Sequence, residues 1–201
     1  MTTDLRVIKT RETIKRGFLA CIDRQYFSKL TIAELTHEMQ INKSTFYTYY
    51  EDKYDLRSKL IASALQSFSN SIDISYLKLT PSEIKNYEQK LPTALLPLFK
   101  QRATFMTLWS PKLESNVFEQ MEKIFVEKFL AALATTPPAE SNVHYQELQA
   151  RLFAASAMQV IKWWFEISPT TPVTEVARII AACLTSGTYV AFNSPTRHHN
   201  P

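Results

Sequence analysis

Glycine is nearly absent from this chain: among 201 residues only Gly17 and Gly187 occur. Tight β-turns and glycine-rich phosphate loops depend on the backbone freedom of glycine, so its scarcity disfavours both and favours helices. The ten prolines then serve mainly as starts and stops of helices. We therefore predict an all-α fold, with a length sufficient for one or two domains.

The stretch 31–56 carries the most specific local pattern. Thr31 followed three residues later by Glu34 is a capping box, which marks the start of a helix. Apolar residues at helical spacing then give this helix an inner face, formed by Ile32, Leu35 and Met39. Gln40 and Ile41 follow as a short connection.

A second short helix is predicted from Lys43 to Tyr50, with Asn42 as its cap. Phe46 and Tyr50 are four residues apart, so they lie on one side and anchor the helix. The opposite side presents small polar and aromatic residues, namely Ser44 and Thr48 flanked by Thr45 and Tyr47. Two helices joined by a tight turn are typical of a helix-turn-helix DNA reader, although a short aromatic helix pair also occurs as ordinary core.

The ordered elements of this stretch resemble the N-terminal DNA-binding domain of the tetracycline-repressor (TetR-type) family of transcriptional regulators. The resemblance covers about the first quarter of the chain. It is carried by the runs Thr31-Ile32-Ala33-Glu34-Leu35, Asn42-Lys43-Ser44-Thr45-Phe46-Tyr47, and Tyr50 with Asp52-Lys53-Tyr54-Asp55-Leu56. The chain departs from the family at Tyr26 and Gln40, where glycine is usual, which leaves the conformation of both turns open.

The resemblance implies the DNA contacts by position. The recognition-helix positions that face the operator correspond to Lys43, Ser44, Thr45, Tyr47, Thr48 and Tyr49, with Tyr47 commonly on a phosphate. Lys53 matches a lysine that clamps a phosphate, and Thr31 matches a cap whose helix end meets the DNA backbone. Arg6, Lys9 and Thr10, in a basic segment near the start, could add phosphate contacts, although such a segment is often only a solvated face.

The family also implies the domain organisation. A three-helix helix-turn-helix domain over residues 1–55 is linked by a helix over 52–72 to a helical effector and dimerisation domain over 73–192. A disordered tail is expected over 193–201. Thr80-Pro81 predicts a helix start in the second domain, whereas Pro92 and Pro97 predict that the following apolar segment kinks or breaks.

The second domain of the family often holds a small effector. Ring-rich candidates for lining such a cavity are Phe99, Phe105, Met106, Trp109, Phe118, Met121 and Phe125. Few charges among them would suit an apolar or aromatic compound, but each residue is also a plausible core residue. A regulator without an effector stays an open alternative.

The last two predicted helices, over 143–167 and 171–189, are apolar around much of their surface, so a partner subunit is a natural cover. In the resembled family these helices form the dimer interface. The predicted interface residues are Met158, Ile161, Trp164, Phe165, Ile180 and Leu184. Periodicity alone does not separate such an interface from a further core layer.

The charge of the chain is concentrated at its front. Residues 1–60 carry eleven Lys or Arg against eight Asp or Glu, a net of +3, whereas residues 61–201 carry twelve against eleven, a net of +1. This excess suits duplex DNA and predicts binding that needs two copies and weakens with salt. Nothing groups a base with a nucleophile or spaces metal ligands, so we expect no enzyme, cofactor or metal site.

The compartment follows from the cysteines and the apolar runs. Cys21 and Cys183 lie in apolar helical patterns and are expected to be small buried thiols. A charged start and the lack of a membrane-length apolar run lead us to expect a cytoplasmic protein.

These observations lead us to expect a homodimeric repressor that binds a palindromic operator and is released by a small apolar or aromatic effector. The first alternative is an activator or a regulator controlled by a protein partner, with no cavity large enough for a ligand. A helical small-molecule carrier that has lost DNA binding is a further alternative, disfavoured by the intact run from Lys43 to Lys53.

Overall fold

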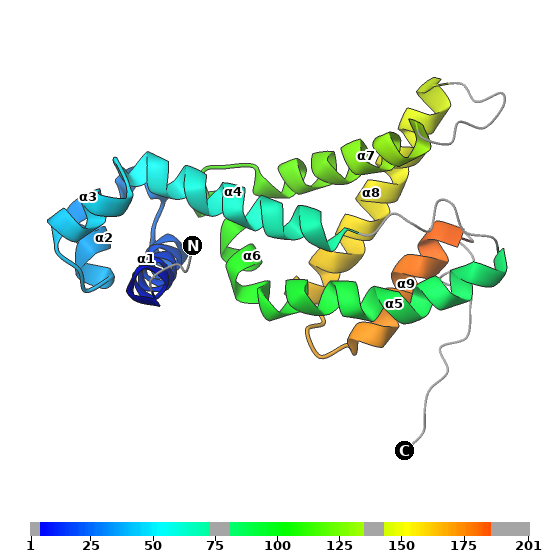
Figure 1. Cartoon of the computed structure of the whole chain (residues 1–201), viewed down its shortest axis with the longest axis horizontal. Helices are drawn as coiled ribbons and strands as arrows, with labels where there is room; N and C mark the ends of the chain where they lie inside the picture. The colour runs from blue at the N-terminus through cyan, green and yellow to red at the C-terminus, as the bar shows by residue number, and fades with distance from the viewer. Residues whose placement is uncertain (1–4, 73–80, 135–142, 186–201) are drawn as a thin grey trace, which may run out of the picture. The chain divides into compact units, whose positions relative to one another are not determined.

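The computed structural model describes residues 5–72, 81–134 and 143–185, and every regular element in these ranges is a helix (Figure 1). This confirms the all-α prediction. The elements are α1 (Leu5–Arg24), η1 (Phe27–Lys29), α2 (Ile32–Glu38), α3 (Lys43–Tyr49), α4 (Lys53–Ser71), α5 (Pro81–Lys100), α6 (Arg102–Leu108), η3 (Pro111–Leu113), α7 (Val117–Ala134), α8 (Val143–Glu166) and α9 (Val173–Thr185). The predicted tail, 193–201, lies outside the described residues.

The chain forms two compact units. The first comprises Met1–Phe68 together with Gln101–Gln120, and the second comprises Ser69–Lys100 with Met121–Pro201. A segment far along the sequence, carrying α6 and η3, therefore belongs to the same unit as the N-terminal helices.

The core of the first unit is built on the inner face of α1. Apolar side chains that are at most 3% exposed come from successive elements: Ile14, Phe18, Cys21, Ile22, Phe27, Leu30, Leu35, Met39, Phe46 and Leu56. Gly17 permits α1 and α2 to pack closely, because a Cβ at this position would lie 2.6 Å from Met39 Cγ and 3.1 Å from Met39 Cα. Cys21 is a free buried thiol, as predicted, whereas Cys183 is only half-buried.

The segment 101–120 is joined to the N-terminal helices by polar contacts. Thr107 Oγ1 donates to Asp23 Oδ1 over 2.8 Å. Glu114 accepts from both the backbone N–H and the hydroxyl of Ser28, over 2.9 and 2.7 Å, and Arg57 donates to the carbonyl of Leu113 over 3.2 Å. These long-range bonds fix the segment beside η1 and α4.

In the second unit, α9 packs against both α5 and α8. Trp164 on α8 is 1% exposed, and its indole N–H donates to the carbonyl of Thr171 over 2.9 Å. Phe99 on α5 stacks on the Trp164 ring with a centroid separation of 4.4 Å. These contacts hold the C-terminal end of α5 against α8.

The helix start at Pro81 is confirmed. We expected a kink or a break at Pro92 and Pro97, and a break is wrong, since α5 continues through both residues to Lys100. An internal proline costs a backbone hydrogen bond and about 3 kcal/mol. Leu91, Leu95 and Leu98, spaced along one face of this helix, are 4–7% exposed. The free energy gained by burying this face offsets the cost.

Candidate nucleic-acid interface

The N-terminus of α2 has the predicted capping box. The Glu34 backbone N–H donates to Thr31 Oγ1 over 3.2 Å, and the Thr31 backbone N–H donates to Glu34 Oε2 over 2.8 Å. Hydrogen bonds from the Thr31 backbone and side chain lower the pKa of the Glu34 carboxyl. The cap therefore fixes where α2 begins and keeps Thr31 at the surface.

The turn between the two helices is closed by Gln40, whose φ of 54° places it in the left-handed region. The Gln40 N–H donates to the carbonyl of His37 and the Ile41 N–H to that of Thr36, each over 3.1 Å. This pair of bonds is a Schellman motif, which usually places glycine at the left-handed residue. At the other departure from the family, Tyr26 is extended, with φ of −66° and ψ of 142°, and needs no glycine.

Helix α3 is anchored as predicted. Asn42 Oδ1 accepts from the Thr45 N–H over 2.7 Å and so caps the helix. Phe46 is 0% and Tyr50 8% exposed, with ring centroids 5.8 Å apart. The two rings bury the inner side of α3 and leave its opposite side outside the core.

The outer side of α3 carries the residues predicted to contact DNA. Lys43, Ser44, Tyr47 and Thr48 are exposed, whereas Thr45 and Tyr49 are half-buried. The hydroxyls have local partners: Ser44 Oγ donates to Asn42 Oδ1 over 2.8 Å, and Thr48 Oγ1 donates to the Ser44 carbonyl over 2.9 Å. Each hydroxyl oxygen can still accept a hydrogen bond from a DNA base.

Lys53 is engaged inside the first unit. Its Nζ donates to the carbonyls of Phe27, Ser28 and Leu30 over 3.1, 3.0 and 2.8 Å. It also lies 4.9 Å from the centroid of the Phe27 ring. A lysine ammonium has three donors, so these carbonyls use all of them. The structure thus gives Lys53 a structural role that the family resemblance did not indicate.

Two further residues predicted to contact DNA, Arg6 and Lys9, are exposed on α1. Thr10 is half-buried and donates to the Arg6 carbonyl over 2.8 Å.

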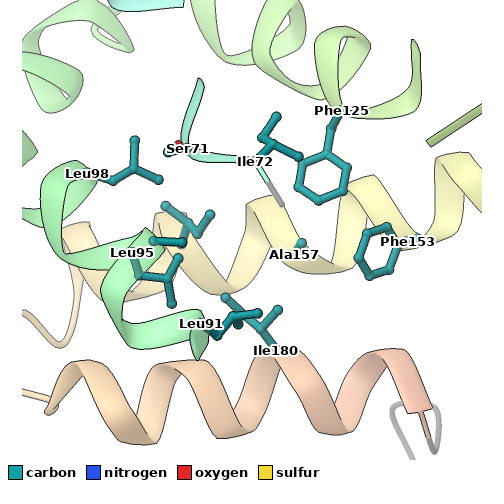
Figure 2. Close-up of a pocket in the computed structure, with 11 residues that line it drawn as sticks. Ser71, Ile72, Leu91, Leu95, Leu98, Phe125, Phe153, Ala157 and Ile180 are labelled. Carbon is teal, nitrogen blue, oxygen red and sulfur yellow. The ribbon is translucent and has the colours of Figure 1, made fainter. Parts of the chain in front are cut away.

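The residues predicted to line a ligand cavity come from both units. Phe105, Met106, Trp109 and Phe118 belong to the first unit, whereas Phe99, Met121 and Phe125 belong to the second. The second unit contains a cavity of about 50 Å³ between α5, α7, α8, α9 and the end of α4 (Figure 2). Of the predicted set, Phe125 lines it.

The other residues of this cavity were missed. Leu91, Leu95 and Leu98 reach it from α5, Phe153 and Ala157 from α8. The spacing of the three leucines was the available signal for an inner face. Every lining residue except Ser71 is apolar.

The predicted dimer residues with described side chains are buried within the single chain. Met158, Ile161, Trp164, Phe165 and Ile180 are 0–5% exposed, and the side chain of Leu184 lies outside the described residues. A different part of α8 is exposed and apolar: Leu148 is 51%, Leu152 60% and Trp163 36% exposed. These three positions fall on one side of the helix.

Within the part of the chain that the structure describes, no helix combines the length and the apolar character needed to cross a bilayer. Across the same ranges, no group of three or more His, Cys, Asp or Glu side chains is arranged to hold a metal ion.

Comparison with known proteins supports a helix-turn-helix regulator. No protein-family model matches the chain. Over 94 residues, 46% of its length, the chain is 30% identical to an uncharacterized HTH-type transcriptional regulator, YxbF, of Bacillus subtilis (strain 168), but it spans only 24% of that relative. The fold is similar to that of the dihydroxyacetone kinase operon activator DhaS, with a TM-score of 0.56 at 13% identity, over 88% of this chain and 94% of that one. The relative is described as a transcriptional regulator, and the solved structure shows the similarity of the fold alone.

Proposed function

We propose that this protein regulates transcription by binding duplex DNA through α2 and α3, as a TetR-type regulator would. One observation carries the proposal: a Schellman turn joins two capped helices, of which the second buries Phe46 and Tyr50 and exposes Lys43, Ser44 and Thr48. A helix held in this way can enter the major groove with its polar side toward the bases.

Some of these side chains are expected to contact phosphates and others base edges. A gel-shift titration at two salt concentrations, with DNA from upstream of the protein's own coding region, tests this division. A substitution that removes one phosphate contact from each subunit of a dimer should flatten the dependence of log K on log salt by about 1.8, at about 0.9 per contact. We expect this for Lys43→Ala and not for Lys90→Ala, a matched change of an exposed lysine on α5. Thr48→Ala should instead change the ranking of operator variants. Identical behaviour of both α3 variants on every sequence would contradict the division of roles.

A homodimer on a palindromic operator is part of the proposal. The exposed apolar side of α8, with Leu148, Leu152 and Trp163, supports it, because such residues are costly to leave in water and a second copy of α8 can cover them. We expect Leu152→Glu to shift the molecule toward monomers in sedimentation velocity. Gln149→Glu, a change of an exposed polar residue on the same helix, should leave the dimer intact. A wild-type monomer at all concentrations would rule out the dimer.

Repression relieved by a small apolar or aromatic effector is the form of regulation that we propose. The apolar lining of the cavity in the second unit supports it. However, its volume of about 50 Å³ is below the roughly 300 Å³ of common ligand sites, so an effector must widen it. The small volume equally favours the alternative, an activator or a regulator controlled by a protein partner.

The two forms of regulation differ in their response to an apolar probe. If an effector acts through the cavity, indole should release the protein from DNA, and Ala157→Phe, which fills the cavity, should abolish the release. Retention of the DNA complex at saturating indole and with other small aromatic compounds would favour the protein-partner alternative.

A further inference from the structure

A second hollow, unrelated to the apolar cavity, lies in the first unit beside the end of α3. Its volume is about 350 Å³, and its walls come from α1, the end of α3 and α4. The residues that matter are Arg11, Lys15, Lys59, Tyr49 and Tyr50, and we call this hollow the basic groove. Its volume is in the range of sites that hold small molecules.

The basic groove is positively charged. Three cations and one carboxylate, Glu12, line it, which gives a formal charge of +2 from +3 and −1. Lys59 is paired with Asp55 over 2.8 Å. Within the described ranges, neither Arg11 nor Lys15 has an ion-pair partner. Two of the three cations are therefore available to an anion.

Tyr50 adds a donor to the groove. The residue is 8% exposed, and among the described residues its hydroxyl has no hydrogen-bond partner. Burial raises the pKa of this phenol, and the charges of Arg11 and Lys59 are close enough to oppose the rise. A protonated phenol can donate a hydrogen bond to an anion, and a buried tyrosine hydroxyl usually has an acceptor.

The walls of the groove are also partly apolar, because Tyr49 and Leu60 line it beside the charged groups. An adjoining hollow of about 160 Å³ shares Lys15, Leu60 and Ser63 with it and extends toward α6. Space of this size exceeds what a single phosphate group of a DNA backbone would occupy. The ligand that fits this space is a molecule in which an anionic group is attached to a larger apolar or aromatic group.

We propose that the basic groove binds a small organic anion, a carboxylate or phosphate monoester attached to an apolar or aromatic body. Arg11 and Lys15 hold the anionic group, Tyr50 donates to it, and Tyr49 and Leu60 contact the body. The site goes beyond the proposed function, since binding here does not require that α3 binds DNA. Because Tyr49 and Tyr50 end α3, an occupant would touch the last turn of the recognition helix.

The test is calorimetric titration of the full chain, without DNA and at low ionic strength, with phenyl phosphate as the probe. Benzyl alcohol is the neutral comparison. We expect saturable binding of phenyl phosphate, with Arg11→Gln and Tyr50→Phe each weakening it by roughly 10- to 150-fold, the scale of one hydrogen bond to a charged group. Arg16→Gln, an exposed arginine on the same helix outside the groove, is the matched control and should bind as the wild type does.

The Tyr50→Phe change keeps the buried ring, and circular dichroism on the same samples checks that each variant is folded. The proposal is overturned if phenyl phosphate gives no saturable heat, if benzyl alcohol binds equally well, or if Arg16→Gln weakens binding as much as Arg11→Gln. It is also overturned if the groove variants weaken only DNA binding, which would make the groove a contact for a backbone phosphate. Failure of DNA binding alone leaves the calorimetric result unaffected.

Discussion

Lys53 offers the sharpest test of how the first unit is held together. Replacing it with methionine keeps the apolar stem against the Phe27 ring and removes the three bonds from Nζ to the carbonyls of Phe27, Ser28 and Leu30. Water can replace part of this hydrogen bonding, because Lys53 is only half-buried. We therefore expect Lys53→Met to lower the free energy of unfolding by about 2 kcal/mol, within the range for hydrogen bonds to a charged group.

The assay is urea unfolding followed by circular dichroism, with thermal unfolding as a second measure. For a chain of this length the destabilisation corresponds to a fall in Tm of roughly 4–8 °C. Lys29→Met, a change of an exposed lysine at the end of η1, is the matched control and should stay within about 0.5 kcal/mol of the wild type. If Lys53→Met is as stable as the wild type while its DNA binding loses salt dependence, the ammonium serves a phosphate and our reasoning is refuted.

Three further predictions concern the joints between helices. Gly17→Ala should destabilise the chain by about 1–3 kcal/mol, because the added Cβ would lie 2.6 Å from Met39 Cγ. A second change, Met39→Ala, should relieve part of that strain, and thermal unfolding of the double-mutant cycle measures both effects. Unchanged stability of Gly17→Ala would contradict the close packing of α1 and α2. At position 40, where the backbone is left-handed, Gln40→Val should lower the free energy of unfolding by about 1–2 kcal/mol, whereas Gln40→Gly should leave it unchanged or raise it slightly. The reverse order of stability in urea unfolding would argue against the left-handed conformation. Thr31→Ala should cost about 1 kcal/mol at neutral pH because the cap is removed. The pKa of Glu34 is lowered in the folded chain, so the ionised Glu34 carboxylate stabilises the fold at neutral pH, and this contribution disappears as the pH falls through the folded pKa. Thr31→Ala should therefore lose less stability on acidification than the wild type. Parallel pH profiles of stability for the two proteins would contradict this link between the cap and the pKa.

The helix pair could be predicted because its determinants are local. Caps at Thr31 and Asn42 and the spacing of Phe46 and Tyr50 act over three or four residues, and the structure has each of them as expected. The left-handed conformation of Gln40 was harder to predict from the sequence. Glycine is favoured there, but the two Schellman bonds and the burial of the flanking helices hold a glutamine in the same conformation.

The partners of Lys53 could not be predicted from position. Its resemblance to a phosphate-clamping lysine carried no information on Phe27, Ser28 and Leu30, which lie more than twenty residues earlier in the chain. Only folding of η1 against the start of α4 brings the three carbonyls to the ammonium.

The sequence alone predicted that this chain is helical, where α2 and α3 begin, and which side of α3 faces inward. These features depend on residues one helical turn apart. Tertiary structure decided which apolar side of α8 is core. Met158 and Trp164 are buried, and Trp164 stacks on Phe99 of α5, whereas Leu152 is exposed. It likewise decided that α5 survives two prolines, since burial of its leucines outweighs the missing hydrogen bonds. Both outcomes depend on surfaces that meet only after distant segments pack, and periodicity is the same whichever partner covers a face.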